Sequence, residues 1–153
     1  MANNGVEPDG LGPLIGAVRA EFVRALEREL AREGVPLRFS QFRVVKLLAL
    51  QGAMMTTELA RAVDHDAGAM TRLLDQLVAR GYLRRVPRPE DRRAVLVELT
   101  EAGRLVWAAI DRVSSGVGDA ALQNLSPTER EQLLDLLRRI RGSLQERNNL
   151  PEQ

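Results

Sequence analysis

A change of hydrophobic pattern at Gly81 constrains the fold of this chain more than any other feature of its sequence. Before Gly81, apolar residues recur at helical spacing from Met70 to Val78, which predicts a helix with one buried face. After Gly81, extended runs over residues 82–86 and 94–99 replace the helical spacing, which predicts two strands of a hairpin. We therefore expect a helix that leads directly into a β-hairpin.

The predicted helix has an outward face suited to close approach by another molecule. It should begin at Asp66, whose carboxylate can cap free backbone N–H groups, and end at Gly81. Its buried stripe leaves six small or hydrogen-bonding residues outward: Gly68, Thr71, Arg72, Asp75, Gln76 and Ala79. Small residues let a helix backbone approach DNA, and side chains such as Thr, Arg and Gln reach base edges or phosphates. The face is typical of a helix that reads a major groove.

Positive charge is concentrated around this helix and the hairpin. Between residues 72 and 93, seven arginines and three carboxylates give a local charge of +4, whereas the whole chain carries +1. Two prolines, Pro87 and Pro89, stiffen the loop between the strands. Only Lys46 among the 22 basic residues is a lysine, so the position of the arginines is more informative than their number. Their position favours contact with a phosphate backbone.

Other helices are expected before and after this stretch. Ser40 and Thr56 are expected to cap two helices that precede the reading helix and complete a helix-turn-helix. Near the C-terminus, Ser126, Pro127 and Glu129 form the pattern of a capping box, which predicts a further helix start.

Several motifs resemble one protein family in order and spacing. Residues 91–100 have an Asp, any residue, an Arg, five more residues and then Leu-Thr, in the form Asp91-Arg92-Arg93-Ala94-Val95-Leu96-Val97-Glu98-Leu99-Thr100. Upstream stand Phe39-Ser40-Gln41-Phe42, Thr57-Glu58-Leu59-Ala60 and Leu77-Val78-Ala79-Arg80-Gly81-Tyr82-Leu83. On these motifs, the chain resembles the MarR family of transcription regulators from about residue 14 to 144.

The resemblance implies a fold and a division of the chain. The fold would be mainly α with a small β-hairpin wing, a winged helix-turn-helix with N- and C-terminal dimerisation helices. Residues 1–10 would be a disordered N-terminus, 11–35 the N-terminal dimerisation helix and 36–100 the DNA-binding region. The C-terminal dimerisation helices would occupy 101–147, with a frayed tail over 148–153. These helices would form a homodimer whose two reading helices lie about 34 Å apart on a pseudo-palindromic operator. The alternative is that the terminal helices pack within one subunit.

The same resemblance implies a set of DNA-binding residues. They are Gly68, Thr71, Arg72, Gln76, Arg84, Arg88, Asp91, Arg92 and Arg93. Arg93 resembles the family's wing arginine, which enters a minor groove, and Asp91 resembles the carboxylate that holds that arginine. For Arg84, Arg88 and Arg92, a solvated surface position is an equal alternative. Many relatives carry hydroxyl residues where this chain has Gly68 and Ala69, so base reading at that end would rely more on DNA shape.

A small, often anionic aromatic effector is also implied by the resemblance. By position, its pocket would involve Phe22, Phe39, His65 and Trp107. Core packing is the alternative for both phenylalanines, and core or pocket wall for Trp107. Capping or solvent exposure is the alternative for His65. No second His or Cys stands at metal-ligand spacing, so we expect neither a metal nor a cofactor.

Composition narrows the function classes. The chain has 153 residues and contains no cysteine, no Gly-rich phosphate loop and no catalytic triad pattern. We therefore do not expect an enzyme. No apolar run approaches the roughly 18 residues of a membrane span and no secretory signal is visible, so a cytoplasmic protein is expected. We interpret the chain as a homodimeric DNA-binding repressor released by a ligand. The alternatives are a regulator without small-molecule input and a winged helix used for protein–protein interaction.

Overall fold

The computed structural model describes residues 10–88 and 91–149, and for residues 88 and 92–94 it describes the backbone alone. Of the expected disordered residues 1–10 and the expected frayed tail 148–153, residues 1–9 and 150–153 lie outside the described residues, and α6 extends to Asn148. The chain divides into two compact units, one ending at Val117 and the other beginning at Gly118. No helix in the described ranges is long and apolar enough to cross a membrane.

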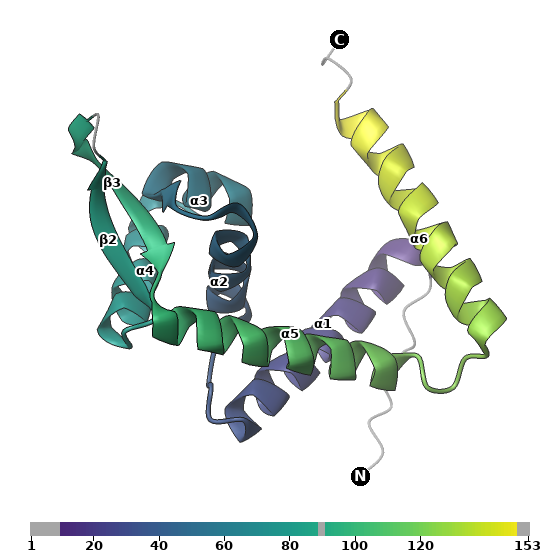
Figure 1. The fold of residues 1–153 in the computed structure, drawn as a ribbon. Helices are drawn as coiled ribbons and strands as arrows, with labels where there is room; N and C mark the ends of the chain where they lie inside the picture. The colour runs from purple at the N-terminus through teal and green to yellow at the C-terminus, as the bar shows by residue number, and fades with distance from the viewer. Residues whose placement is uncertain (1–9, 89–90, 150–153) are drawn as a thin grey trace. The chain divides into compact units, whose positions relative to one another are not determined.

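The first unit contains four helices, a small sheet and most of a fifth helix (Figure 1). In chain order, these are α1 (Leu11–Arg32), α2 (Phe39–Gln51), β1 (Met54–Met55), α3 (Thr56–Val63), α4 (Ala67–Ala79), β2 (Leu83–Arg88), β3 (Asp91–Leu99) and α5 (Glu101–Ala121). The predicted helix-turn-helix and hairpin are confirmed by α3, α4, β2 and β3.

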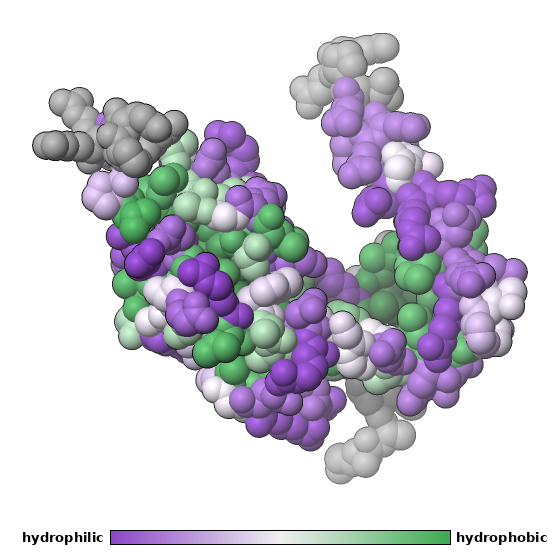
Figure 2. Space-filling view, in the orientation of Figure 1, coloured by the Kyte–Doolittle hydropathy of each residue, from purple (hydrophilic) through white to green (hydrophobic). Residues whose placement is uncertain are grey.

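The winged region is held by one continuous hydrophobic core. Residues of α2, α3, α4, β3 and α5 all contribute fully buried side chains, among them Val44, Leu59, Leu74, Val97 and Ile110. The C-terminal half of α1 joins this core through Leu26 and Leu30. Large apolar side chains remain exposed at Leu50, Val95 and Leu105, and Figure 2 shows green hydrophobic patches among hydrophilic surface on the winged region.

The sheet is antiparallel in the order β1-β3-β2. In β2 and β3, Leu83 pairs with Leu99 and Arg84 pairs with Glu98, which turns the leucines towards the core. The two-residue strand β1 pairs with Val97 and Leu96 of β3 and was not expected from the sequence, because two residues are too short to show a period. The sheet therefore fixes the wing to the chain segment between α2 and α3.

Two predicted helix caps are wrong. Ser40 was expected to cap α2, but α2 already begins at Phe39, whose N–H donates to the Glu27 side chain of α1 over 2.7 Å. Thr56 is the first residue of α3, and the residue before it, Met55, donates its N–H to Glu58 over 2.8 Å. In the first of these starts, a distant carboxylate takes the place of a local hydroxyl.

The second unit contains the end of α5 and the helix α6 (Pro127–Asn148). The capping box predicted at its start is confirmed, because the Glu129 N–H donates to Ser126 Oγ over 3.3 Å and the Ser126 N–H donates to Glu129 over 2.8 Å. No residue within α6 is buried. Its leucines at 134, 136, 137 and 144 are all exposed.

Candidate nucleic-acid interface

Helix α4 is fixed at its start by a side-chain cap and along one face by the core. The Ala69 N–H donates to Asp66 Oδ1 over 2.8 Å, as the sequence predicted. That hydrogen bond is the main reason why the pKa of Asp66 lies below its ordinary value. The predicted stripe is confirmed as well, since Met70, Leu73, Leu74 and Leu77 are buried and Val78 is half-buried. The opposite face is therefore held outward.

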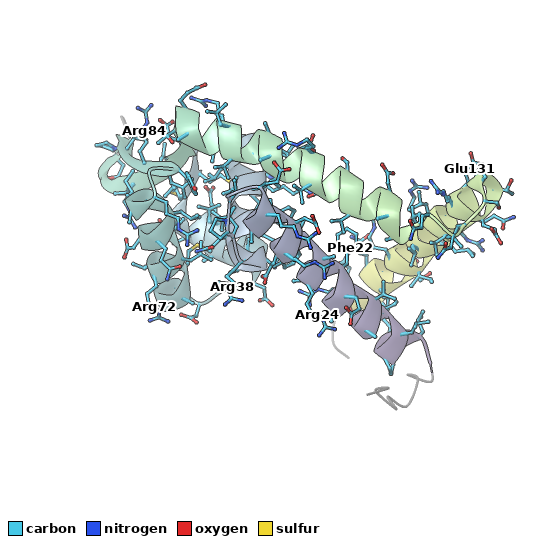
Figure 3. The ribbon with its side chains drawn as sticks, turned by 90° about the horizontal axis from the view of Figure 1, so that it is seen from below. Phe22, Arg24, Arg38, Arg72, Arg84 and Glu131 are labelled. Atoms are coloured by element: carbon cyan, nitrogen blue, oxygen red, sulfur yellow. The ribbon has the colours of Figure 1, made fainter. Side chains whose placement is uncertain are left out.

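The outward face carries the residues that the sequence assigned to DNA reading. Gly68, Thr71, Arg72 and Gln76 are all exposed. Thr71 turns its hydroxyl back to the Ala67 carbonyl over 2.9 Å, which leaves oxygen lone pairs to accept from outside. Figure 3 shows Arg72 projecting from the winged region on the same side as Arg38. Donors, acceptors and a cation thus share one exposed surface.

An ion pair attaches the wing to α4. Arg85 of β2 lies 2.6 Å from Asp75 of α4, so one strand of the wing is linked to the outward face of the helix. Across the wing, Arg84 lies 2.6 Å from Glu98, its cross-strand partner. Neither pair was predicted. The ion pair with Glu98 would make Arg84 less available to phosphates. The ion pair between Asp75 and Arg85 orients the wing relative to α4.

The remaining wing residues are described only in part. Asp91 begins β3 and is exposed, but the side chains of Arg88, Arg92 and Arg93 lie outside the described residues. The predictions of a minor-groove arginine at Arg93 and of phosphate contacts by Arg88 and Arg92 therefore remain predictions.

A buried amide beside α4 contacts a residue of the outward face, and the sequence did not predict this contact. Gln41 of α2 donates from Nε2 to Gln76 Oε1 over 2.8 Å. Gln41 precedes Val45 by four residues and Leu48 by seven, so helical periodicity places it on the buried face of α2. A polar residue on a buried face was the available signal, because such a residue needs a hydrogen-bond partner.

Two surface cavities lie on either side of this amide pair. The larger, about 510 Å³, is lined by residues of α1, the α1–α2 loop, α2 and the end of α4. The smaller, about 240 Å³, is lined by α2, α4 and His65 between α3 and α4. Arg38, Gln41 and Gln76 line both cavities. These cavities therefore adjoin the reading helix.

Only one of the four predicted pocket residues lines either cavity. His65 lines the smaller one, with its Nδ1 3.1 Å from the Val63 carbonyl. Phe39 stacks on Phe42 with ring centroids 5.4 Å apart, and the Arg19 guanidinium lies 5.5 Å from the Phe39 ring. Phe22, which Figure 3 labels on α1, and Trp107 of α5 are half-buried against the core. No group of three or more potential metal ligands occurs among the described residues.

A compact joint connects the wing to α5. Thr100 Oγ1 lies 2.5 Å from the Gly81 carbonyl, and the Thr100 N–H donates to the Tyr82 carbonyl over 3.0 Å. The Gly103 N–H then donates to Thr100 Oγ1 over 3.1 Å. A Cβ on Gly103 would lie 2.1 Å from the Tyr82 carbonyl oxygen, so only glycine fits there without a shift of the backbone. The end of α4, the wing and α5 are thereby tied together.

Comparison with known proteins gives consistent matches over this architecture. Residues 37–95 match the model of the MarR family. The multiple antibiotic resistance protein MarR of Salmonella typhimurium is 32% identical over 131 residues, which cover 85% of this chain and 90% of that protein. The crystal structure of a mutant MarR from Escherichia coli complexed with operator DNA is 30% identical, with a TM-score of 0.73 over 85% of this chain and 92% of that one.

A third match comes from a structure that was solved to explain regulation by a ligand. It is BpsR of Bordetella bronchiseptica, whose structure concerns the mechanism by which 6-hydroxynicotinic acid regulates DNA binding by BpsR. BpsR is 26% identical and has a TM-score of 0.71, with 86% of this chain and 93% of that one covered.

Proposed function

The chain belongs to the MarR family of DNA-binding transcription regulators, and from this premise we propose that it is a homodimeric repressor of a pseudo-palindromic operator, released by a small anionic aromatic ligand. It would act in the cytoplasm without a cofactor. The observation that carries the proposal is the outward face of α4, where Thr71, Arg72 and Gln76 are exposed and the Asp75–Arg85 ion pair links the wing to the same helix.

DNA reading by α4 is supported by both chemistry and comparison. The exposed arginine and hydrogen-bonding side chains suit phosphates and base edges in a major groove. The match to a MarR structure complexed with operator DNA supports the proposal that α4 reads a defined DNA site. The wing predictions at Arg88, Asp91, Arg92 and Arg93 are part of the same proposal, with Arg93 in a minor groove.

The DNA proposal is tested on the intergenic DNA beside the protein's own gene. We expect tight binding by the wild type that weakens steeply as salt rises, because each neutralised phosphate contributes nearly one unit to the log–log slope. Arg72→Ala should weaken binding and lower the slope by about one unit. Arg24→Ala, which removes an exposed arginine of α1 paired with Glu21, is the matched control. Weak binding that ignores both substitutions would favour a winged helix used for protein–protein interaction.

Dimerisation would cover apolar helix faces that the chain leaves open. The N-terminal half of α1 exposes Leu11, Leu14, Ile15 and Val18, and α6 exposes four leucines. Apolar side chains on soluble helices are usually buried. A second copy supplies a matching surface by symmetry, and two reading helices about 34 Å apart would then meet consecutive major grooves. We therefore assign residues 11–35 and 101–147 to dimerisation.

The cavities beside α4 are where we would look for a ligand. Both are lined by Arg38, whose guanidinium suits a carboxylate, and both reach Gln76 of the reading helix. Regulation of BpsR by 6-hydroxynicotinic acid supports an aromatic acid as the kind of ligand. We propose that such a ligand separates or rotates the winged lobes, because the Thr100 joint would pass movement between α5 and the wing.

The ligand proposal is tested by adding 6-hydroxynicotinic acid to the protein–operator complex. We expect the operator affinity of the wild type to fall by about 5-fold to 150-fold, the usual range of coupling between sites. Arg38→Gln should abolish this response, and Arg61→Gln, an exposed arginine of α3, should retain it. A panel of aromatic acids without effect would instead identify a regulator without small-molecule input. A half-site spacing that is identical in free and liganded dimers would exclude lobe movement.

A further inference from the structure

Gln41 is the only buried polar side chain among the side chains that the structure describes. Only 4% of its surface is exposed, beside apolar neighbours on α2 such as Val44 and Val45. Burying an amide is unfavourable unless its hydrogen bonds are satisfied. Both ends of this amide have partners, which makes Gln41 a fixed element.

The direction of the Gln41 amide is set by a backbone donor. The Arg38 N–H donates to Gln41 Oε1 over 3.0 Å. Because a backbone N–H can only donate, the amide atom beside it must be the oxygen, and the nitrogen must point the other way. That nitrogen lies 2.8 Å from Gln76. An amide nitrogen can only donate, so the Gln76 atom that faces it must be the carbonyl oxygen, Oε1.

This chain of donors and acceptors determines what Gln76 shows to its surroundings. Its carbonyl is turned towards α2, so the group left on the exposed side is the Nε2 amide with its N–H donors. A free glutamine reads adenine with an acceptor and a donor together, because adenine presents the acceptor N7 beside the donor N6, whereas guanine presents two acceptors, N7 and O6. A side chain that presents donors alone suits acceptors.

We propose that Gln41 is a positioning residue for sequence reading, which holds Gln76 so that α4 selects guanine over adenine at one position of each half-site. This inference rests on the proposed function, because it presumes that α4 reads DNA.

The amide pair is also tied to α1. Glu27 accepts the Phe39 N–H over 2.7 Å, next to the Arg38 N–H that orients Gln41. The start of α2 is therefore held from two directions, by its own Gln41 and by a carboxylate of α1. This attachment keeps the Arg38 donor in place, so the orientation of Gln76 does not depend on α4 alone.

The test is selection of preferred sites from DNA in which the half-sites are randomised, using the full chain. Gln41→Leu removes the donor that holds the Gln76 carbonyl, so adenine should gain about five-fold or more over guanine at one position of each half-site. In Gln41→Glu, one carboxylate oxygen still accepts from the Arg38 N–H and the other accepts from Gln76, which turns the Gln76 carbonyl outward. This variant should shift the same position towards bases that present an amino donor, cytosine or adenine.

Gln76→Leu and Gln51→Leu complete the set. Gln76→Leu should flatten the preference at that position alone. Gln51→Leu changes an exposed glutamine at the end of α2, the helix of Gln41, and should reproduce the wild-type profile. If circular dichroism shows that Gln41→Leu does not fold, the base preferences of Gln41→Glu and Gln76→Leu test the inference. A wild-type profile in Gln41→Glu or in a folded Gln41→Leu, or no positional change in Gln76→Leu, would overturn the inference. Absence of sequence preference in the wild type itself would refute the proposed function instead.

Discussion

Helices α4 and α6 carry similar leucine stripes and opposite degrees of burial. In α4, Leu74 is 0% exposed and its neighbours on the stripe are buried by other elements of the same unit. In α6, Leu137 is 42% exposed and no residue of the helix is buried. Both helices begin at a side-chain cap. Local sequence thus specifies a helix and its apolar face, but it does not say whether the surface that covers this face belongs to the same chain.

The largest expected difference between the two helices is in stability. Leu74→Ala should lower the free energy of unfolding by about 2–5 kcal/mol, because it leaves a cavity in the core. That loss should be the same at every protein concentration. For Leu137→Ala, we expect a loss that grows smaller as the protein is diluted, measured by urea unfolding over a range of concentrations. Equal, concentration-independent losses would contradict the contrast between α4 and α6.

A second pair of substitutions makes the comparison within α5. Gly103→Ala should destabilise the protein by about 1–3 kcal/mol, since its Cβ would overlap the Tyr82 carbonyl oxygen and force the joint apart. Gly116→Ala is the control in the same helix, with no atom within 4 Å of the added Cβ. It should stabilise the helix by about 0.5–1 kcal/mol. Thermal unfolding of the two variants measures the sign of each stability change. A Gly103→Ala variant as stable as the wild type would show that the backbone at the joint shifts to accommodate the added Cβ.

A third prediction concerns the proposed cover of α6. Leu137→Glu should raise the dimer dissociation constant about tenfold or more, because a charge would be buried in the interface. The equivalent charge at Gln132, an exposed polar residue of α6, should have little effect. Sedimentation equilibrium of the two variants measures the difference. A wild-type protein that remains monomeric at every concentration would contradict the proposed dimer.

The smallest expected effect is in the pH dependence of the two helix caps. Hydrogen bonds from the backbone lower the pKa of Asp66 at the start of α4 and of Glu129 at the start of α6. A carboxylate with a lowered pKa contributes stability that is complete above its ordinary pKa and is lost as pH falls through the folded value. For Asp66, this loss should occur at a pH below the ordinary pKa of an aspartate.

The two caps can be separated by substitution. Asp66→Asn keeps a capping acceptor that does not titrate, so its unfolding midpoint in urea should fall less steeply on acidification than that of the wild type. Glu129→Gln should do the same for α6. A wild-type pH slope in both variants would show that other groups control acid sensitivity.

Local signals made much of the fold predictable from the sequence. The cap at Asp66, the stripe of α4 and the capping box at Ser126 are all set by residues within one or two turns, and each was confirmed. One contact at the α2 start could not be predicted in this way, because the Phe39 N–H donates to Glu27, which is 12 residues away and meets it only in the folded unit.

The site was less predictable than the fold for the same reason. The family resemblance made Arg84 a candidate for DNA contact, with a solvated surface position as an equal alternative, but the strand register that places it opposite Glu98 depends on the folded hairpin. Gln41 stood in a recognised motif, yet its role depends on Gln76, 35 residues further along. Residue type predicted which side chains have suitable chemistry, whereas the folded contacts determine which of them are already engaged.

The place of Trp107 has a practical consequence for spectroscopy. It is the only tryptophan of the chain and lies half-buried on α5, against the core of the winged region. Indole emission therefore comes from a single location, one helical turn beyond the Gly103 joint. Intrinsic fluorescence of the unlabelled protein would report changes at this joint without an attached dye, with Tyr82 as the only other phenol or indole in the molecule.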